Sequence, residues 1–243
     1  MVILIAFATF ISTLVGGLFA LRFKDKLHLV LGFSAGALIS VAFFDLLPEA
    51  INLATGFYSP TTIIQFTAVG FLSYLVLDRL IFFHAHHEDV SHDHVSDIHE
   101  HSSELGAGSL AIHSFFDGVA IGLGFQVSSA VGAVMAVAVL VHDFSDGINT
   151  VNLILRNDGG RRSALKWLLL DAFTPILGVL STLLFTLSEH VLAIILSIFA
   201  GFFLYISATD LIPESHHAHP KLITTVMTLL GVFVLYAAIQ FAA

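Results

Sequence analysis

Two short motifs place metal-binding side chain types at helical spacing inside apolar sequence. His113 and Asp117 are four residues apart, and His142 and Asp146 repeat that spacing, so each pair lies on one face of a helix. Asp143 lies directly after His142. Imidazole combined with carboxylate suits zinc, iron(II) or manganese(II). These five side chains therefore predict a site for a divalent transition metal.

The surroundings of these motifs leave their charge uncompensated. An ionised carboxylate in the middle of a membrane helix costs at least about 2.5–3.5 kcal/mol. The sequence has no Lys or Arg between Arg79 and Arg156, so a local salt bridge cannot compensate for the acids. A divalent cation or bound protons can. The alternative interpretation is a hydrogen-bonded cluster between helices with protonated acids.

The composition indicates that lipid surrounds most of the chain. Of the 243 residues 57% are hydrophobic and 11% are charged, whereas a soluble domain carries about a quarter charged residues. The sequence contains no cysteine, which excludes disulfides and thiolate metal ligands. We expect membrane lipid as a partner, and no nucleic acid.

Apolar runs of about 20 residues each span a bilayer as a helix. We predict an all-α polytopic membrane protein that forms a single transporter domain over residues 1–243. The first run precedes the first basic residue, Arg22, so it is interpreted as a retained helix and not as a signal peptide. Eight spans are expected, at roughly 1–21, 30–52, 61–83, 105–126, 128–155, 163–187, 191–213 and 221–241.

The basic residues predict the orientation of these spans. With eight helices, all of them fall on one side of the membrane, which the positive-inside rule makes cytoplasmic. Both termini are then expected outside the cytoplasm. The residues that carry this prediction are Arg22, Lys24, Lys26, Arg79, Arg156, Arg161, Arg162, Lys166 and Lys221.

The sequence contains two internal repeats that indicate an inverted-repeat transporter. The segment from Ala35-Gly36 to Asp45-Leu46-Leu47-Pro48-Glu49 recurs with identical spacing from Ala200-Gly201 to Asp210-Leu211-Ile212-Pro213-Glu214, and residues 113–118 resemble residues 142–147. The related helices cross the membrane in opposite directions. We therefore expect helices 1–3 and 6–8 to be related around central helices 4 and 5, with the site near the midplane.

Five further acids are candidate site residues. Pro48 and Pro213 should kink or loosen their helices, and carbonyls freed nearby could join an ion pathway with the adjacent acids. Asp171 could complete the central cluster or pair with a hydroxyl such as that of Thr174. Glu49 and Glu214 could equally well end helices at the membrane interface. The five acids are Asp45, Glu49, Asp210, Glu214 and Asp171.

A histidine-rich segment, residues 84–104, separates the third and fourth spans. It contains seven histidines and six acids, and such tracts bind metal weakly and reversibly. We predict a cytoplasmic loop that tunes transport; a merely soluble linker is the alternative.

These residues together resemble the ZIP (Zrt-, Irt-like protein) family of metal transporters, and the resemblance covers nearly the whole chain. The family's fourth and fifth helices carry His-Asn-x-Pro-Glu-Gly and His-Glu-x-Pro-Glu-Gly, where this chain has His-Ser-Phe-Phe-Asp-Gly from His113 and His-Asp-Phe-Ser-Asp-Gly from His142. The resemblance implies uptake of zinc, or of iron, manganese or cadmium, toward the cytoplasm by alternating access. It also implies that the transport site lies between helices 4 and 5 and consists of His113, Asp117, His142, Asp143 and Asp146.

This chain departs from that family pattern at several positions. Both signature prolines are missing, so helices 4 and 5 are expected to be less broken. Ser114 replaces an amide ligand, and Thr174-Pro175 stands where the family often has Glu-Pro. A second metal position built from those groups is therefore in doubt, unless Asp171 substitutes for the missing ligand.

Two other classes of protein are weighed against a ZIP transporter. Cation diffusion facilitators, which export metal, also carry His-x-x-x-Asp pairs, but they usually have six spans and a cytoplasmic C-terminal domain. An intramembrane metalloprotease would need His-Glu-x-x-His, which the chain lacks. We therefore expect a transporter and not an enzyme, in the plasma membrane, with the divalent metal as substrate, no cofactor, and a homodimer as a possible assembly.

Overall fold

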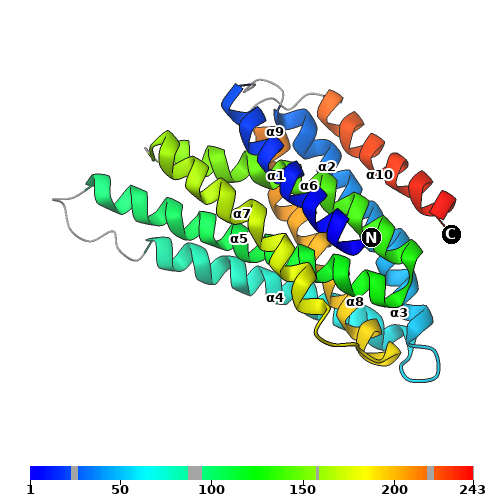
Figure 1. Cartoon of the computed structure of the whole chain (residues 1–243). Coiled ribbons are helices and arrows are strands. Elements are labelled where there is room, and N and C mark those ends of the chain that lie inside the picture. The colour runs from blue at the N-terminus through cyan, green and yellow to red at the C-terminus, as the bar shows by residue number, and fades with distance from the viewer. Residues whose placement is uncertain (23–26, 87–94, 157–158, 218–221, 243) are drawn as a thin grey trace.

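The computed structural model describes residues 1–22, 27–86, 95–156, 159–217 and 222–242, and all regular structure in these ranges is helical. The helices lie side by side in one bundle (Figure 1). Their bounds are α1 Val2–Arg22, α2 Leu27–Val41, η1 Ala42–Leu46, α3 Leu47–Leu53, α4 Pro60–His86, α5 Val95–Val127, α6 Ser129–Arg156, α7 Arg161–Thr182, α8 Glu189–Tyr205, η2 Ile206–Leu211, α9 Ile212–His217 and α10 Leu222–Ala242.

Eight helices of the described chain are long and apolar enough to cross a membrane. The predicted polytopic all-α fold is thereby confirmed. Two of the spans are composite, because α2, η1 and α3 form the second and α8, η2 and α9 the seventh. The two termini lie on the same side of Figure 1, away from the ends of α4 and α5 that flank residues 87–94, as an even number of spans requires.

The sixth span is shorter than the predicted 163–187, because α7 ends at Thr182. The side chain of Gln126 accounts for this end. Its amide donates to the carbonyls of Thr182, at 3.0 Å, and Phe185, at 2.8 Å, and its carbonyl accepts from the Leu187 amide at 3.1 Å. A side chain from another helix thus satisfies backbone groups that a longer α7 would pair internally.

The two Asp-Leu-x-Pro-Glu motifs have the same backbone irregularity. A π-helical turn, η1 or η2, ends directly before a short helix whose second residue is Pro48 or Pro213. Proline lacks an amide hydrogen, so the regular ladder cannot continue through it, and π turns concentrate at functional sites. Equal distortion at equivalent places supports the inverted repeat that the sequence predicts.

Glycine contacts provide a second test of the repeat. Gly118 of α5 lies against the carbonyl of Pro175 in α7, and the equivalent Gly147 of α6 lies against the carbonyl of Thr13 in α1. A Cβ on either glycine would overlap that backbone oxygen. These two glycines have a packing role, because small residues let membrane helices approach closely.

The same reciprocity holds throughout the bundle. The carbonyls of Phe144 and Phe115 lie against Gly16 and Gly178, the carbonyls of Thr228 and Thr67 against Gly36 and Gly201, and the carbonyls of Phe33 and Ile198 against Gly231 and Gly70. In each of these three pairs of contacts, the glycine and the carbonyl of one contact occupy the positions in the repeat that are equivalent to those of the other contact. The first three membrane spans and the last three are therefore related by an inverted repeat around α5 and α6.

The bundle consists of two groups of spans. The first contains α1, α5, α6 and α7, and the second contains α10, the span from α2 to α3, the span from α8 to α9, and α4. Each of the glycine contacts above joins helices of the same group. The groups meet mainly where α2 crosses α6, and also where α5 touches α4 and α8.

The histidine-rich segment is only partly described. Helix α4 continues to His86 and α5 begins at Val95, so helix covers both ends of the predicted loop 84–104. Residues 87–94 lie outside the described residues.

Candidate metal centre

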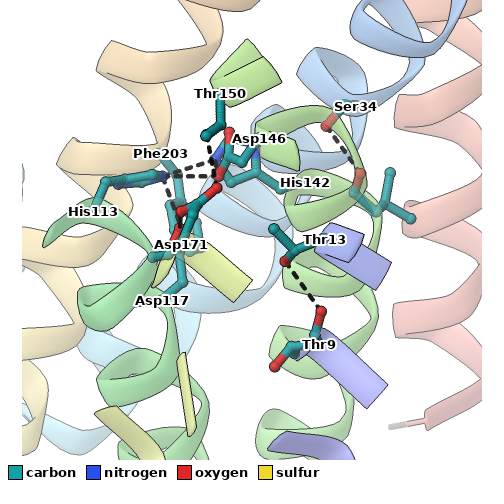
Figure 2. Close-up of polar contacts among 12 residues, drawn as sticks. Thr9, Thr13, Ser34, His113, Asp117, His142, Asp146, Thr150, Asp171 and Phe203 are labelled. Atoms are coloured by element: carbon teal, nitrogen blue, oxygen red, sulfur yellow. Dashed lines mark hydrogen bonds and ion pairs between the residues drawn. The ribbon is translucent and has the colours of Figure 1, made fainter. Parts of the chain in front are cut away.

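Four side chains from two neighbouring helices converge in the interior (Figure 2). They are His113 and Asp117 of α5 and His142 and Asp146 of α6. One ligand atom from each lies within 4.8 Å of all the others. These are four of the five residues that the two motifs predict.

The separations are those of atoms that point at a common centre. The two Nε2 atoms of His113 and His142 are 2.7 Å apart. Oδ2 of Asp117 lies 3.1 Å from Nε2 of His113, and Oδ2 of Asp146 lies 3.1 Å from Nε2 of His142 and 3.7 Å from that of His113. All four residues are buried.

The polar atoms of this cluster are poorly satisfied by protein groups. Oδ2 of Asp117 and Oδ2 of Asp146 are buried and have no partner in the described chain apart from the imidazole nitrogens given above, and the buried Nδ1 of His142 has no hydrogen-bond partner there. Leaving a buried polar atom unpaired costs about 1–3 kcal/mol, and more for a charged group. An arrangement that converges and yet remains unsatisfied fits a site that a cation completes.

The helices that carry the four clustered residues are continuous. Both α5 and α6 pass through their motifs without a break, as expected from the absence of the signature prolines. The glycine contacts hold α5 against α7 and α6 against α1. Residues four apart lie one turn apart on the same face of a helix. His113 therefore lies next to Asp117, and His142 lies next to Asp146.

Asp143 is fully buried on α6, and neither of its carboxylate oxygens has a hydrogen-bond partner among the described residues. It lies close enough to Asp117, Asp146 and Asp171 for their charges to act on it. It is not one of the four clustered residues. Its free oxygens remain available to a metal or a water molecule next to the cluster.

Asp171 is also fully buried, but its carboxylate is engaged. It accepts hydrogen bonds from Ser114 at 2.6 Å and from Thr150 at 2.8 Å. The hydroxyl of Thr174, suggested by the sequence as a partner, instead donates to the Asp171 backbone carbonyl at 2.8 Å. Asp171 therefore pairs with hydroxyls other than the expected one and lies outside the group of four.

The four remaining predicted acids lie on the irregular spans and are not among the four clustered residues. Asp45 and Glu49 are partly buried on η1 and α3, Asp210 is exposed on η2, and Glu214 is partly buried on α9. Oδ2 of Asp45 is buried and has no hydrogen-bond partner in the described chain. The structure does not bring these acids to the four ligands.

Asp78 is a polar residue of interest that the sequence analysis missed. A pocket lined by Tyr74, Leu77, Asp78, Ser109, Ile112, His113 and Phe116 joins it to the central histidine. The Asp78 carboxylate accepts from the hydroxyl of Tyr205 at 3.0 Å, and the Tyr74 ring packs edge-on against the His113 ring. An acid inside the predicted third span, residues 61–83, was the available signal.

Known proteins resemble this chain in sequence. The family described as "ZIP Zinc transporter" matches residues 107–238. The protein "Zinc transporter ZupT" of Shigella dysenteriae serotype 1 (strain Sd197) is 28% identical over 90% of this chain and 86% of its own length. The protein of the same name from Escherichia coli O7:K1 (strain IAI39) is 27% identical over the same shares. "Zinc transporter foi" of Drosophila melanogaster is 28% identical over 49% of this chain and 17% of its own length.

The family match covers α5 to α10 almost completely and includes both ligand motifs. The bacterial relatives extend the similarity over nearly the whole chain. The fold, the paired motifs and these matches agree: the chain belongs to the ZIP family of zinc transporters and is a membrane transporter, not an enzyme.

Proposed function

We propose that this protein carries divalent transition-metal ions, zinc first among them, across the membrane into the cytoplasm by alternating access. The transport site consists of His113, Asp117, His142 and Asp146. The observation that carries this proposal is their convergence: two imidazoles and two carboxylates, all buried, with their ligand atoms within 4.8 Å of one another.

The separations suit a tetrahedral zinc ion. With bonds of about 2.0–2.2 Å to nitrogen and oxygen, neighbouring ligand atoms are about 3.3–3.6 Å apart. Three separations between Nε2 and Oδ2 atoms, 3.1, 3.1 and 3.7 Å, bracket that range, and the two Nε2 atoms, 2.7 Å apart, need only a small movement apart. Iron and manganese accept the same ligands, so the selectivity of the site among these metals depends on its coordination geometry.

Asp143 supplies a further carboxylate for the ion as it enters or leaves the site. Both of its oxygens lack a protein partner, and it lies within the electrostatic reach of Asp117 and Asp146. At the two ends of the path, Asp45 with Glu49 and Asp210 with Glu214 attract the ion toward the membrane interior.

The two sides of the site differ in polarity, and this difference favours an ion path on the side of His113 that leads toward the cytoplasm. The polar atoms on the His113 side come from Tyr74, Asp78 and Tyr205, and the pocket reaches His113. The corresponding residues on the other side are Leu235, Ile239 and Ser40, which are all buried. By the positive-inside rule the Asp78 end, next to Arg79, is cytoplasmic, and both termini then face outside.

Metal uptake by purified protein in liposomes tests this proposal. Zinc, manganese, iron(II) and cadmium are supplied in turn, and the accumulated metal is measured. We expect zinc uptake by the native protein, and loss of it in the variants His113→Ala and Asp146→Asn. Ser197→Ala is the matched control, because this buried hydroxyl donates only to Ile194 of its own helix.

Two results would overturn the proposal. Full transport rates in both site variants would remove the four residues from the path. Absence of uptake of all four metals by native protein that inserts correctly would remove the function itself.

A further inference from the structure

We propose that Asp171 is a positioning residue that fixes α5 and α6 at the separation the metal needs, and that it is not a ligand itself. This inference rests on the proposed transport site. Three observations carry it: the hydrogen bonds that occupy Asp171, the positions of the two donors, and the contrast with the other half of the repeat.

Each acceptor group of Asp171 already has a partner within the protein. Oδ1 accepts from Ser114, Oδ2 accepts from Thr150, and the backbone carbonyl accepts from Thr174. The third bond has a local cause. Pro175 has no amide hydrogen to offer the carbonyl four residues earlier, and the Thr174 hydroxyl takes its place. Each carboxylate oxygen keeps a second lone pair, but the two bonds fix the orientation of the carboxylate on Ser114 and Thr150, and Asp171 is not one of the four clustered residues.

The two donors stand beside the ligands on different helices. Ser114 directly follows His113 on α5, and Thr150 lies one turn beyond Asp146 on α6. One carboxylate on α7 therefore ties both ligand-bearing helices to a third helix. Hydrogen bonds to a charged group are stronger than those between neutral groups, so these two hydrogen bonds resist separation or rotation of α5 and α6.

The other half of the repeat lacks this link. Asp143 corresponds to Ser114 and Thr9 corresponds to Asp171, so the carboxylate and the hydroxyl have exchanged helices. Thr9 donates to the carbonyl of Ala6 in its own helix at 2.9 Å, and the carboxylate of Asp143 has no partner among the described residues. Of the two buried acids next to the four ligands, one is therefore committed to a structural link and the other is free to meet the metal.

A double-mutant cycle tests this inference. We compare Asp171→Ala, the double variant Ser114→Ala/Thr150→Val, and the triple variant, and we measure zinc and cadmium affinity of the purified protein by calorimetry. Removing partners that orient metal ligands typically costs about 10–100-fold in affinity. We expect a loss of zinc affinity of about tenfold in Asp171→Ala and in the hydroxyl double variant, and no further loss in the triple variant.

The ratio of zinc to cadmium affinity separates positioning from general destabilisation. A looser pair of helices should disfavour the smaller zinc ion more than cadmium, whereas a partly unfolded sample loses both affinities alike. Asp171→Asn should restore affinity to within about threefold of native, because its amide oxygen accepts one hydroxyl and its amide nitrogen donates to the other.

Matched controls measure the cost of losing a buried hydroxyl. Ser197→Ala and Thr67→Val each remove a hydroxyl that donates only to its own helix, to Ile194 and Ile63 respectively. Both should keep native affinity and a native zinc-to-cadmium ratio.

Loss of affinity in Asp171→Asn combined with native affinity in the hydroxyl double variant would overturn the inference, since Asp171 would then act as a ligand or through its charge. Additive losses in the triple variant would overturn it as well. Failure of the proposed function has a different signature: native protein would bind zinc in the calorimeter with these ratios but accumulate none in liposomes.

Discussion

The two halves of the inverted repeat share their backbone packing and differ in the polar groups that this packing brings together. Gly118 and Gly147 meet equivalent carbonyls, and each half contributes one histidine and one aspartate to the centre. Beyond these residues the halves diverge: Asp171 is bonded twice on one side, and Asp143 is unpartnered on the other. The repeat thus builds the scaffold and the central cluster, and sequence divergence between the halves makes the surroundings of that cluster asymmetric.

This comparison predicts equal roles for the two central aspartates. Asp117→Ala and Asp146→Ala should each lower zinc affinity by at least about 100-fold, the upper end of the effect of removing an outer partner. Calorimetry on the purified variants measures this effect. Affinities that differ by more than about tenfold between the two variants would break the equivalence of the halves, since each tenfold step corresponds to about 1.4 kcal/mol.

The second prediction sharpens the contrast between the two sides of the site. The chain has no cysteine, so a single introduced thiol reports its own exposure. Ser109 lines the pocket, whereas the corresponding Ala138 is fully buried. In metal-free protein Ser109→Cys should react with a membrane-impermeant thiol reagent at least about tenfold faster than Ala138→Cys, because reaction needs an accessible thiolate.

The side of labelling is part of this test. Reagent added from the cytoplasmic side should label Ser109→Cys, and reagent added from outside should not. Equal rates for the two cysteines would show that the two sides of the site do not differ in accessibility. Labelling of Ser109→Cys from outside only would reverse the assignment of the accessible side.

The third prediction concerns the packing that the halves have in common. Gly118→Ala and Gly147→Ala each place a Cβ against a backbone oxygen, and such overpacking costs about 1–3 kcal/mol. Thermal unfolding of the purified variants should show similar losses for both. Gly108→Ala is the control, because its nearest neighbours are ring atoms of Trp167 at 3.8 Å, and it should be neutral or slightly stabilising. A native melting temperature in either test variant would contradict the contact.

The sequence predicts the helices and the central ligands because both follow from local rules. Apolar length marks a span, and the four-residue spacing places His113 and Asp117 on one face without knowledge of the neighbours. The repeated Asp-Leu-x-Pro-Glu motif likewise predicts that two spans are interrupted, although not that a π turn interrupts them.

The relations that the sequence does not predict are those between distant side chains. The bond from Thr150 to Asp171 joins different helices, and so does the Gln126 cap that ends α7 early. A pairing of this kind depends on the rotation of each helix about its own axis, which only packing determines. Asp78 was missed for the same reason, because it relates to the site only through the pocket that it lines together with His113.

The smallest expected effect belongs to the histidine-rich segment, which occurs on only one side of the molecule. Its seven histidines, in residues 84–101, can be replaced by serine while the length of the chain is kept. Such tracts bind metal weakly, and coordinating an ion costs conformational entropy of the chain. Since the four central ligands remain, zinc uptake in liposomes should stay within about threefold of native, with a changed dependence on cytoplasmic metal. Complete loss of uptake in a correctly inserted variant would show that these histidines are part of the transport path, and the central four would then not suffice.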